Sequence, residues 1–84
     1  REISVLVVED DHSLARLLTE RFTLEGFQVT PVGTAAAAER ALADRGFDVV
    51  LLDVGLPDES GFDVAPRLRA LHPAAAILFL TAFD

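Results

Sequence analysis

The strongest constraint on the fold is a regular alternation of short apolar runs with segments of helical spacing. Three runs are almost continuously apolar: Ile3–Val8, Val49–Leu52 and Ile77–Leu80. Such runs are typical of strands that are buried on both faces of a parallel sheet. A fourth run, Phe27–Val32, alternates apolar with polar residues and contains Pro31. Alternation with an internal proline favours a strand at the edge of the sheet.

Helical patterns fill the intervals between these runs. Apolar residues recur at helical spacing from Leu14 to Phe22, Thr34–Arg45 is rich in alanine, and Val64–Leu71 repeats the helical spacing. Strands that alternate with helices in this way predict a parallel α/β sheet with right-handed crossovers. Pro66 lies inside the third helical pattern, so we expect that helix either to start late or to bend.

Acidic and hydroxyl residues stand where three of the predicted strands end. Glu9, Asp10 and Asp11 follow the first strand, Asp53 closes the third, and Thr81 follows the fourth. In an open parallel sheet, ligands bind outside the carboxyl ends of the strands, where the strand order reverses. A strand order of 2-1-3-4 brings these three ends side by side. Each acid taken alone also fits a helix cap or a turn.

Converging carboxylates need a counter-charge, because each one raises the pKa of its neighbours. Mg²⁺ is a suitable partner, since proteins hold it with one or two carboxylates while it keeps several waters and accepts a phosphate oxygen. An ionised aspartate in such a site is a possible nucleophile toward phosphorus, giving an aspartyl phosphate. The acidic cluster therefore predicts a site for phosphoryl transfer, which depends mainly on positioning and charge neutralisation.

Charge and composition exclude several other classes. The formal net charge of −7 argues against direct contact of this segment with nucleic acid, which requires a basic face. No apolar run approaches the roughly 20 residues of a membrane span. Cysteine is absent, so disulfides and thiolate metal sites are excluded and a cytoplasmic location is expected.

Three motifs together resemble the receiver domain of two-component response regulators. They are LVVEDD (Leu6–Asp11), LLDVGLPDESGFD (Leu51–Asp63) and LFLTA (Leu78–Ala82). The resemblance spans residues 1–84 as one partial domain and implies a flavodoxin-like α/β sheet of order 2-1-3-4. The fifth strand and the last helices of the family fold are absent from this sequence.

The resemblance also implies roles for individual acids. Asp53 would be the phosphoacceptor. Mg²⁺ would be bound by Asp10, by Asp53 and by the backbone carbonyl of Gly55, with Glu9 acting through water. Asp11 is an additional acid to which the resemblance gives no settled role.

Further site residues follow from the same resemblance. Thr81 would contact the phosphoryl group and move with it, which would couple phosphorylation to a change at the surface. Leu56, Pro57 and Gly61 match the loop that shapes the site, and Gly61 is expected at a position of positive φ.

A protein with these features would be a regulatory switch and not an enzyme with continuous turnover. It would accept a phosphoryl group from a sensor histidine kinase and signal to an output domain. The motifs are most similar to those of regulators with a DNA-binding winged-helix output. Three other functions remain open: a nucleotide or flavin module, a hydrolase with an aspartate nucleophile, and a pseudo-receiver that serves only as an interaction or dimerisation surface.

The sequence departs from the family pattern in one functional respect. The family's fifth strand carries a lysine that pairs with the phosphoryl group or the acceptor aspartate, and this chain contains no lysine. Without a fifth strand, the apolar run Ile77–Leu80 would form an open edge that invites pairing with another chain. We therefore expect either a longer chain or a partner molecule that covers this edge.

Overall fold

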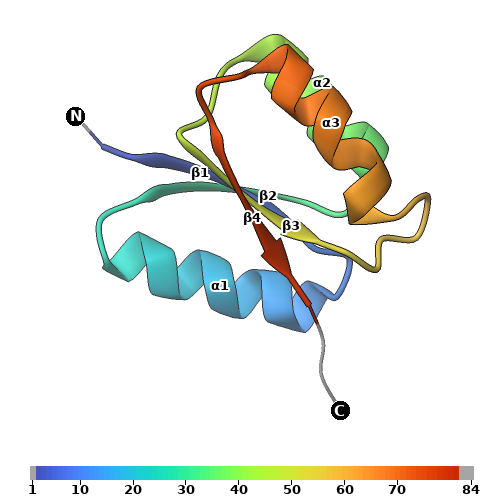
Figure 1. The fold of residues 1–84 in the computed structure, drawn as a ribbon. Helices are drawn as coiled ribbons and strands as arrows, with labels where there is room; N and C mark the ends of the chain where they lie inside the picture. Colours follow the sequence, from blue (N-terminus) through green and yellow to red (C-terminus); the bar gives the residue numbers. More distant parts are fainter. Residues whose placement is uncertain (1, 82–84) are drawn as a thin grey trace.

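The computed structural model describes residues 2–81. They form three layers, in which a sheet of four strands lies between helices on its two faces (Figure 1). The strands are β1 (Ser4–Val8), β2 (Gln28–Val32), β3 (Val49–Asp53) and β4 (Ala76–Leu80). The helices are α1 (His12–Leu24), α2 (Ala35–Asp44) and α3 (Gly61–Leu71). All strand pairs are parallel and their order is β2-β1-β3-β4, which confirms the predicted topology.

Helices cover both faces of the sheet, with α1 on one face and α2 and α3 on the other (Figure 1). Successive side chains of a strand point to opposite faces. In β1, Leu6 and Val8 accordingly lie in the apolar cluster that includes α2 and α3 residues, while Val5 and Val7 lie in the cluster packed against α1. Burial on both faces is the reason that β1 and β3 read as continuous apolar runs.

The two edges of the sheet differ in character. β2 forms one edge, and its Pro31 is paired in register with Val7 of β1, so the predicted edge position is confirmed. β4 forms the other edge within residues 2–81. Its Leu78 and Phe79 are 55% and 42% exposed, and the Phe79 ring contacts the ring of Phe62 in α3. This edge therefore presents apolar side chains, as expected.

Polar residues occupy the caps of α2 and α3, and one expectation about α3 needs correction. Thr34 caps α2, Ser60 caps α3, and His72 ends α3 as its C-cap. The late start considered for α3 is wrong, because the helix begins at Gly61 and passes through Pro66.

Ala82, the last residue of the LFLTA motif, lies outside the described residues. Within residues 2–81, none of the helices has the length and apolar character that a membrane span requires.

Candidate functional site

The carboxyl ends of β1 and β3 bring three acids together. These strands are parallel neighbours and pair Val8 with Leu52, so the residues that follow are adjacent in space. One carboxylate oxygen from each of Glu9, Asp10 and Asp53 lies within 4.8 Å of the others. The structure thus assembles the acids that the sequence places at the ends of two separate strands.

Glu9 is the buried member of this cluster, with 5% of its surface exposed. Burial raises the pKa of its carboxyl group, and the negative charge of Asp53 raises that pKa further. The backbone N–H of Asp11 opposes this effect by donating to Glu9 Oε2 at 3.0 Å. The cluster therefore contains unrelieved repulsion between carboxylates, which a cation would neutralise.

The donor set suits a hard divalent cation. All three side chains offer oxygen, and among the residues described no cysteine or histidine belongs to the group. Oxygen-only coordination is what Mg²⁺ and Ca²⁺ prefer. Asp10 is exposed and Asp53 is partly exposed, so water and larger molecules are able to reach these two carboxylates.

Asp11 has the helix-capping role that the sequence allowed for each acid. It is the N-cap of α1, and its Oδ1 accepts hydrogen bonds from the backbone N–H groups of Ser13 and Leu14 at 3.0 and 3.2 Å. Its carboxylate is thus bound to the first turn of the helix, and Asp11 is not a member of the acidic group.

The loop after β3 is closed at its base beside Asp53. The backbone N–H of Gly55 donates to Asp53 Oδ1 at 3.2 Å, and Gly55 forms an antiparallel bridge with Ser60. Leu56 is 9% exposed and belongs to the core cluster, whereas Pro57 is exposed. Leu56 therefore anchors the loop, while the assigned role of the Gly55 carbonyl remains a prediction.

Gly61 is required for a different reason from the one expected. Among residues 2–81 the only glycine with positive φ is Gly26, so the expected positive φ at Gly61 is wrong. A Cβ at Gly61 would instead lie 2.3 Å from the carbonyl oxygen of Asp53 and 3.0 Å from Val54 Cα. The first residue of α3 packs directly against the backbone that carries the central aspartate.

Thr81 follows β4 at the same end of the sheet. Its predecessor Leu80 is the register partner of Asp53, and the N–H of Val54 donates to the Leu80 carbonyl at 3.1 Å. The Thr81 side chain is exposed. This position is compatible with the predicted contact to a phosphoryl group, which stays a prediction.

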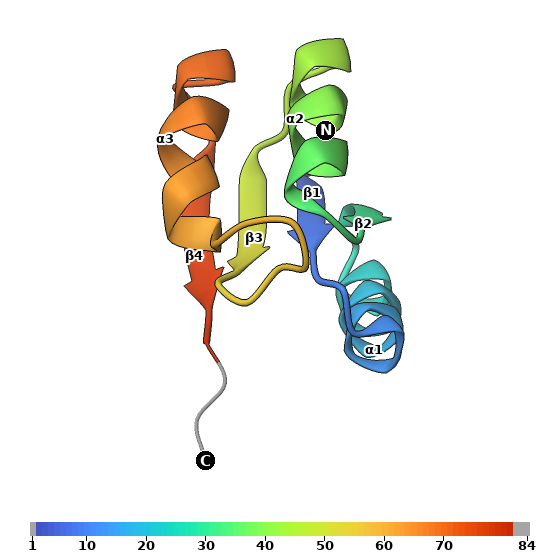
Figure 2. The ribbon, with the colours of Figure 1, turned by 90° about the vertical axis from the view of Figure 1, so that its right-hand side faces the viewer.

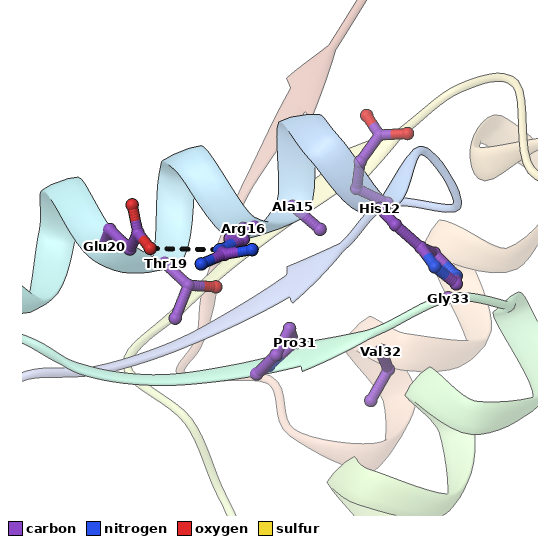
Figure 3. Close-up of a pocket in the computed structure, with 9 residues that line it drawn as sticks. His12, Ala15, Arg16, Thr19, Glu20, Pro31, Val32 and Gly33 are labelled. Atoms are coloured by element: carbon purple, nitrogen blue, oxygen red, sulfur yellow. Dashed lines mark hydrogen bonds and ion pairs between the residues drawn. The ribbon is translucent and has the colours of Figure 1, made fainter.

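A groove of about 500 Å³ lies next to the acids, between α1 and the end of β2 (Figure 3). His12, Arg16 and Thr19 line it from α1, opposite Pro31 and Val32. Glu9 is the one member of the acidic cluster that lines it, and Arg16 forms an ion pair with Glu20. The groove is therefore a neighbour of the site, and Asp10 and Asp53 meet solvent at the carboxyl ends of the strands.

Sequence reasoning missed Asp58, which lies in the loop after β3. Its two carboxylate oxygens accept the backbone N–H groups of Ala35 and Ala36, at the start of α2, at 2.9 and 3.0 Å. An aspartate after a proline reads as an ordinary turn residue. No local signal could have linked it to a helix that begins 23 residues earlier in the chain.

Glu9 provides a prediction of pH dependence in metal-free protein. Because the pKa of Glu9 is raised above its ordinary value of 4.5, the folded chain retains this proton over a pH range in which the unfolded chain has lost it. Stability then falls as the pH rises through that range. We expect Glu9→Gln to raise the free energy of unfolding at pH 7, with a difference from wild type that shrinks as the pH approaches 4.5.

Urea unfolding in the presence of a chelator, followed by circular dichroism at several pH values, measures this difference. Glu2→Gln is the matched control, since it removes the same charge from an exposed residue outside the cluster. Equal stability of Glu9→Gln and wild type at pH 7 would show that repulsion in the cluster is negligible.

Comparison with known proteins agrees with this geometry. Residues 5–84 match the family of the response regulator receiver domain. The probable transcriptional regulatory protein TcrX of Mycobacterium tuberculosis is 42% identical over 82 residues, which are 98% of this chain and 35% of TcrX. The chain thus spans about a third of the length of the curated relatives that it matches.

Solved structures show the same fold. A CheY-like receiver domain from Methylobacillus flagellatus superposes with a TM-score of 0.94 at 32% identity, covering 99% of this chain and 72% of that one. The response regulator TrrA from Thermotoga maritima, solved in complex with Mg²⁺-BeF, has a TM-score of 0.90 at 30% identity and covers 98% of this chain and 71% of its own. The family match, the curated relatives and these structures lead to one assignment: the chain belongs to the receiver domain family of two-component response regulators.

Proposed function

We propose that this receiver domain is a switch that accepts a phosphoryl group on Asp53 from the phosphohistidine of a sensor kinase. The observation that carries the proposal is the convergence of Glu9, Asp10 and Asp53 within 4.8 Å. In the transfer, a carboxylate oxygen of Asp53 forms a bond to phosphorus while the bond from phosphorus to the imidazole nitrogen breaks. The nitrogen keeps the electron pair of that bond.

The residues of the chain supply positioning and charge. Asp10 and Asp53, with the carbonyl of Gly55 and with Glu9 through water, would hold Mg²⁺. When bound, Mg²⁺ supplies the positive charge that lets anionic oxygens approach the acids. The N–H of Gly55, 3.2 Å from Asp53 Oδ1, orients the carboxylate. The TrrA structure supports this assignment, since that relative was solved with Mg²⁺-BeF.

The signal would leave the site through Thr81 and reach an output domain. The relatives named as transcriptional regulatory proteins support a parent chain that regulates transcription, and that chain would act in the cytoplasm. In that chain, DNA contact would belong to the output domain, because this segment carries a net charge of −7. The exposed apolar side chains of β4 would be covered by the rest of the chain or by self-association. The domain would be a regulatory module and not an enzyme with continuous turnover.

A second function is favoured by one observation. Leu78 and Phe79 of β4 are 55% and 42% exposed, and an apolar strand edge of this kind invites pairing with another chain. A pseudo-receiver would keep the fold and the exposed β4 edge as an interaction surface without being phosphorylated.

Intact-mass spectrometry separates the two functions. We expect one phosphoryl group to be gained when the chain is incubated with Mg²⁺ and acetyl phosphate, and the gain to be lost in Asp53→Asn. Asp44→Asn, at the end of α2 and far from the strand ends, is the matched control and should keep the gain. No gain in wild type that binds Mg²⁺ would favour the pseudo-receiver.

A further inference from the structure

The loop of residues 54–60 passes beneath the start of α2 on its way from β3 to α3 (Figure 2). It leaves the sheet directly after Asp53 and contains Gly55, whose carbonyl is assigned to the metal in the proposed function. A loop that provides a backbone ligand must hold that carbonyl in place, and loops are ordinarily the mobile part of a fold. The contacts of this loop therefore bear on the site.

Asp58 fastens the middle of the loop to α2. Its Oδ1 accepts the N–H of Ala35 at 2.9 Å and its Oδ2 accepts the N–H of Ala36 at 3.0 Å. These two hydrogen bonds lower the pKa of the Asp58 carboxyl group. Both N–H groups belong to the first turn of the helix, where they have no partner within the helix itself. An anionic carboxylate is also favoured there by the helix dipole.

A second connection fastens the next residue. Arg67 of α3 pairs with Glu59 of the loop and, through its Nη2, with Glu39 of α2 at 2.7 Å. Each of these partly exposed ion pairs is worth little alone. They add to the bonds of Asp58, so the loop is joined to both helices on that face of the sheet.

The two ends of the loop are joined to each other at its base. Gly55 bridges to Ser60, and the N–H of Gly61 donates to the carbonyl of Val54 at 2.8 Å. Leu56 is buried in the core. Gly55 is thus paired with Ser60, which lies two residues after Asp58, so a displacement of the outer loop at residues 57–60 would be passed to Gly55 through this bridge.

We propose that Asp58 is a positioning residue of the metal site, which acts by tying the loop that carries Gly55 to the N-terminus of α2. The inference rests on the proposed function, in which the Gly55 carbonyl is a ligand. Mg²⁺ demands nearly ideal octahedral geometry, so a small displacement of one ligand weakens binding. Groups that orient metal ligands typically change affinity 10–100-fold when mutated. For a residue one step further from the metal, the lower end of that range applies.

The test is a titration of ¹⁵N-labelled chain with Mg²⁺, followed by NMR, which gives the dissociation constant and reports on Gly55 and Gly61 separately. We expect Asp58→Ala to weaken Mg²⁺ binding about tenfold and to speed hydrogen exchange of the Gly61 amide. Asp58→Asn, which keeps one acceptor oxygen, should give a smaller change of the same kind and serves if the alanine variant does not fold.

Thr34→Ala is the matched control. Thr34 Oγ1 accepts the N–H of Ala37 at 3.0 Å, so this variant also weakens the first turn of α2 but keeps the Asp58 carboxylate and both of the N–H groups that it accepts. It should lose stability while its Mg²⁺ dissociation constant stays within about twofold of wild type. If the Asp58 variants and Thr34→Ala bind Mg²⁺ with equal affinity, the positioning role of Asp58 is overturned, but the proposed function is not. Absence of Mg²⁺ binding in wild type would overturn the proposed function, and this inference with it.

Discussion

Replacement of Gly61 by alanine is expected to lower the free energy of unfolding by about 2–3 kcal/mol. The added Cβ would lie 2.3 Å from the carbonyl oxygen of Asp53 and 3.0 Å from Val54 Cα. Both neighbours are backbone atoms, which cannot move aside as a flexible side chain does. Domains have total stabilities of only about 5–15 kcal/mol, and a chain of 84 residues lies toward the lower end.

The same substitution should disturb the site, because the backbone that must shift carries Asp53, the proposed phosphoacceptor. The hydrogen bond from Gly61 N–H to the Val54 carbonyl, 2.8 Å long, holds the two segments together at this point. We expect the amide resonances of residues 53–55 to move in Gly61→Ala more than those of β1. Urea unfolding followed by circular dichroism measures the loss of stability.

Gly33→Ala is the control for the general effect of adding a methyl group to a glycine. A Cβ at Gly33 has no heavy atom within 4 Å and the residue does not have positive φ. Its effect should remain within about 0.5 kcal/mol. If Gly61→Ala lowers the free energy of unfolding by no more than about 0.5 kcal/mol, α3 can move away from β3 without a significant loss of stability.

The strand positions, the edge position of β2 and the acidic residues could be predicted from local patterns, whereas the strand order followed from the resemblance to receiver domains. The apolar runs at β1 and β3 reflect burial on two faces, and Pro31 marks β2 as an edge. The register of parallel strands then brings Glu9 beside Asp53 without further information. The strands and the acidic cluster are thus encoded by residues whose type and position are informative without knowledge of distant contacts.

The contacts that shape the site loop could not be predicted in this way. Asp58 is an exposed polar residue in a turn, and its partners at α2 lie 22 and 23 residues away. Gly61 was assigned to the site loop, but the reason given was backbone conformation, whereas the structure shows a close approach of two backbones. Both cases depend on distances between elements that are far apart in sequence, which no local pattern encodes.

Asp10→Asn is expected to weaken Mg²⁺ binding by about a hundredfold or more. Its carboxylate oxygen lies within 4.8 Å of those of Glu9 and Asp53, and the amide removes the charge while keeping the shape of the side chain. Removal of groups that only support a metal ligand already costs 10–100-fold in affinity, so loss of a charged ligand should cost at least the upper value. Titration calorimetry with Mg²⁺ at about 0.15 M salt, where exposed charges more than about 8 Å apart are largely screened, measures the change.

Asp11→Asn distinguishes direct coordination of Mg²⁺ by Asp10 from a general attraction of the cation to the acidic residues. It removes the same charge from the adjacent residue, and asparagine is as good an N-cap as aspartate, so the bonds to the N–H groups of Ser13 and Leu14 are preserved. If Asp10 is a direct ligand, Asp11→Asn should change Mg²⁺ affinity by no more than about threefold, the effect of one screened charge nearby. Equal losses in the two variants would mean that the cation is attracted by the summed charge of the strand ends and that Asp10 is not a ligand.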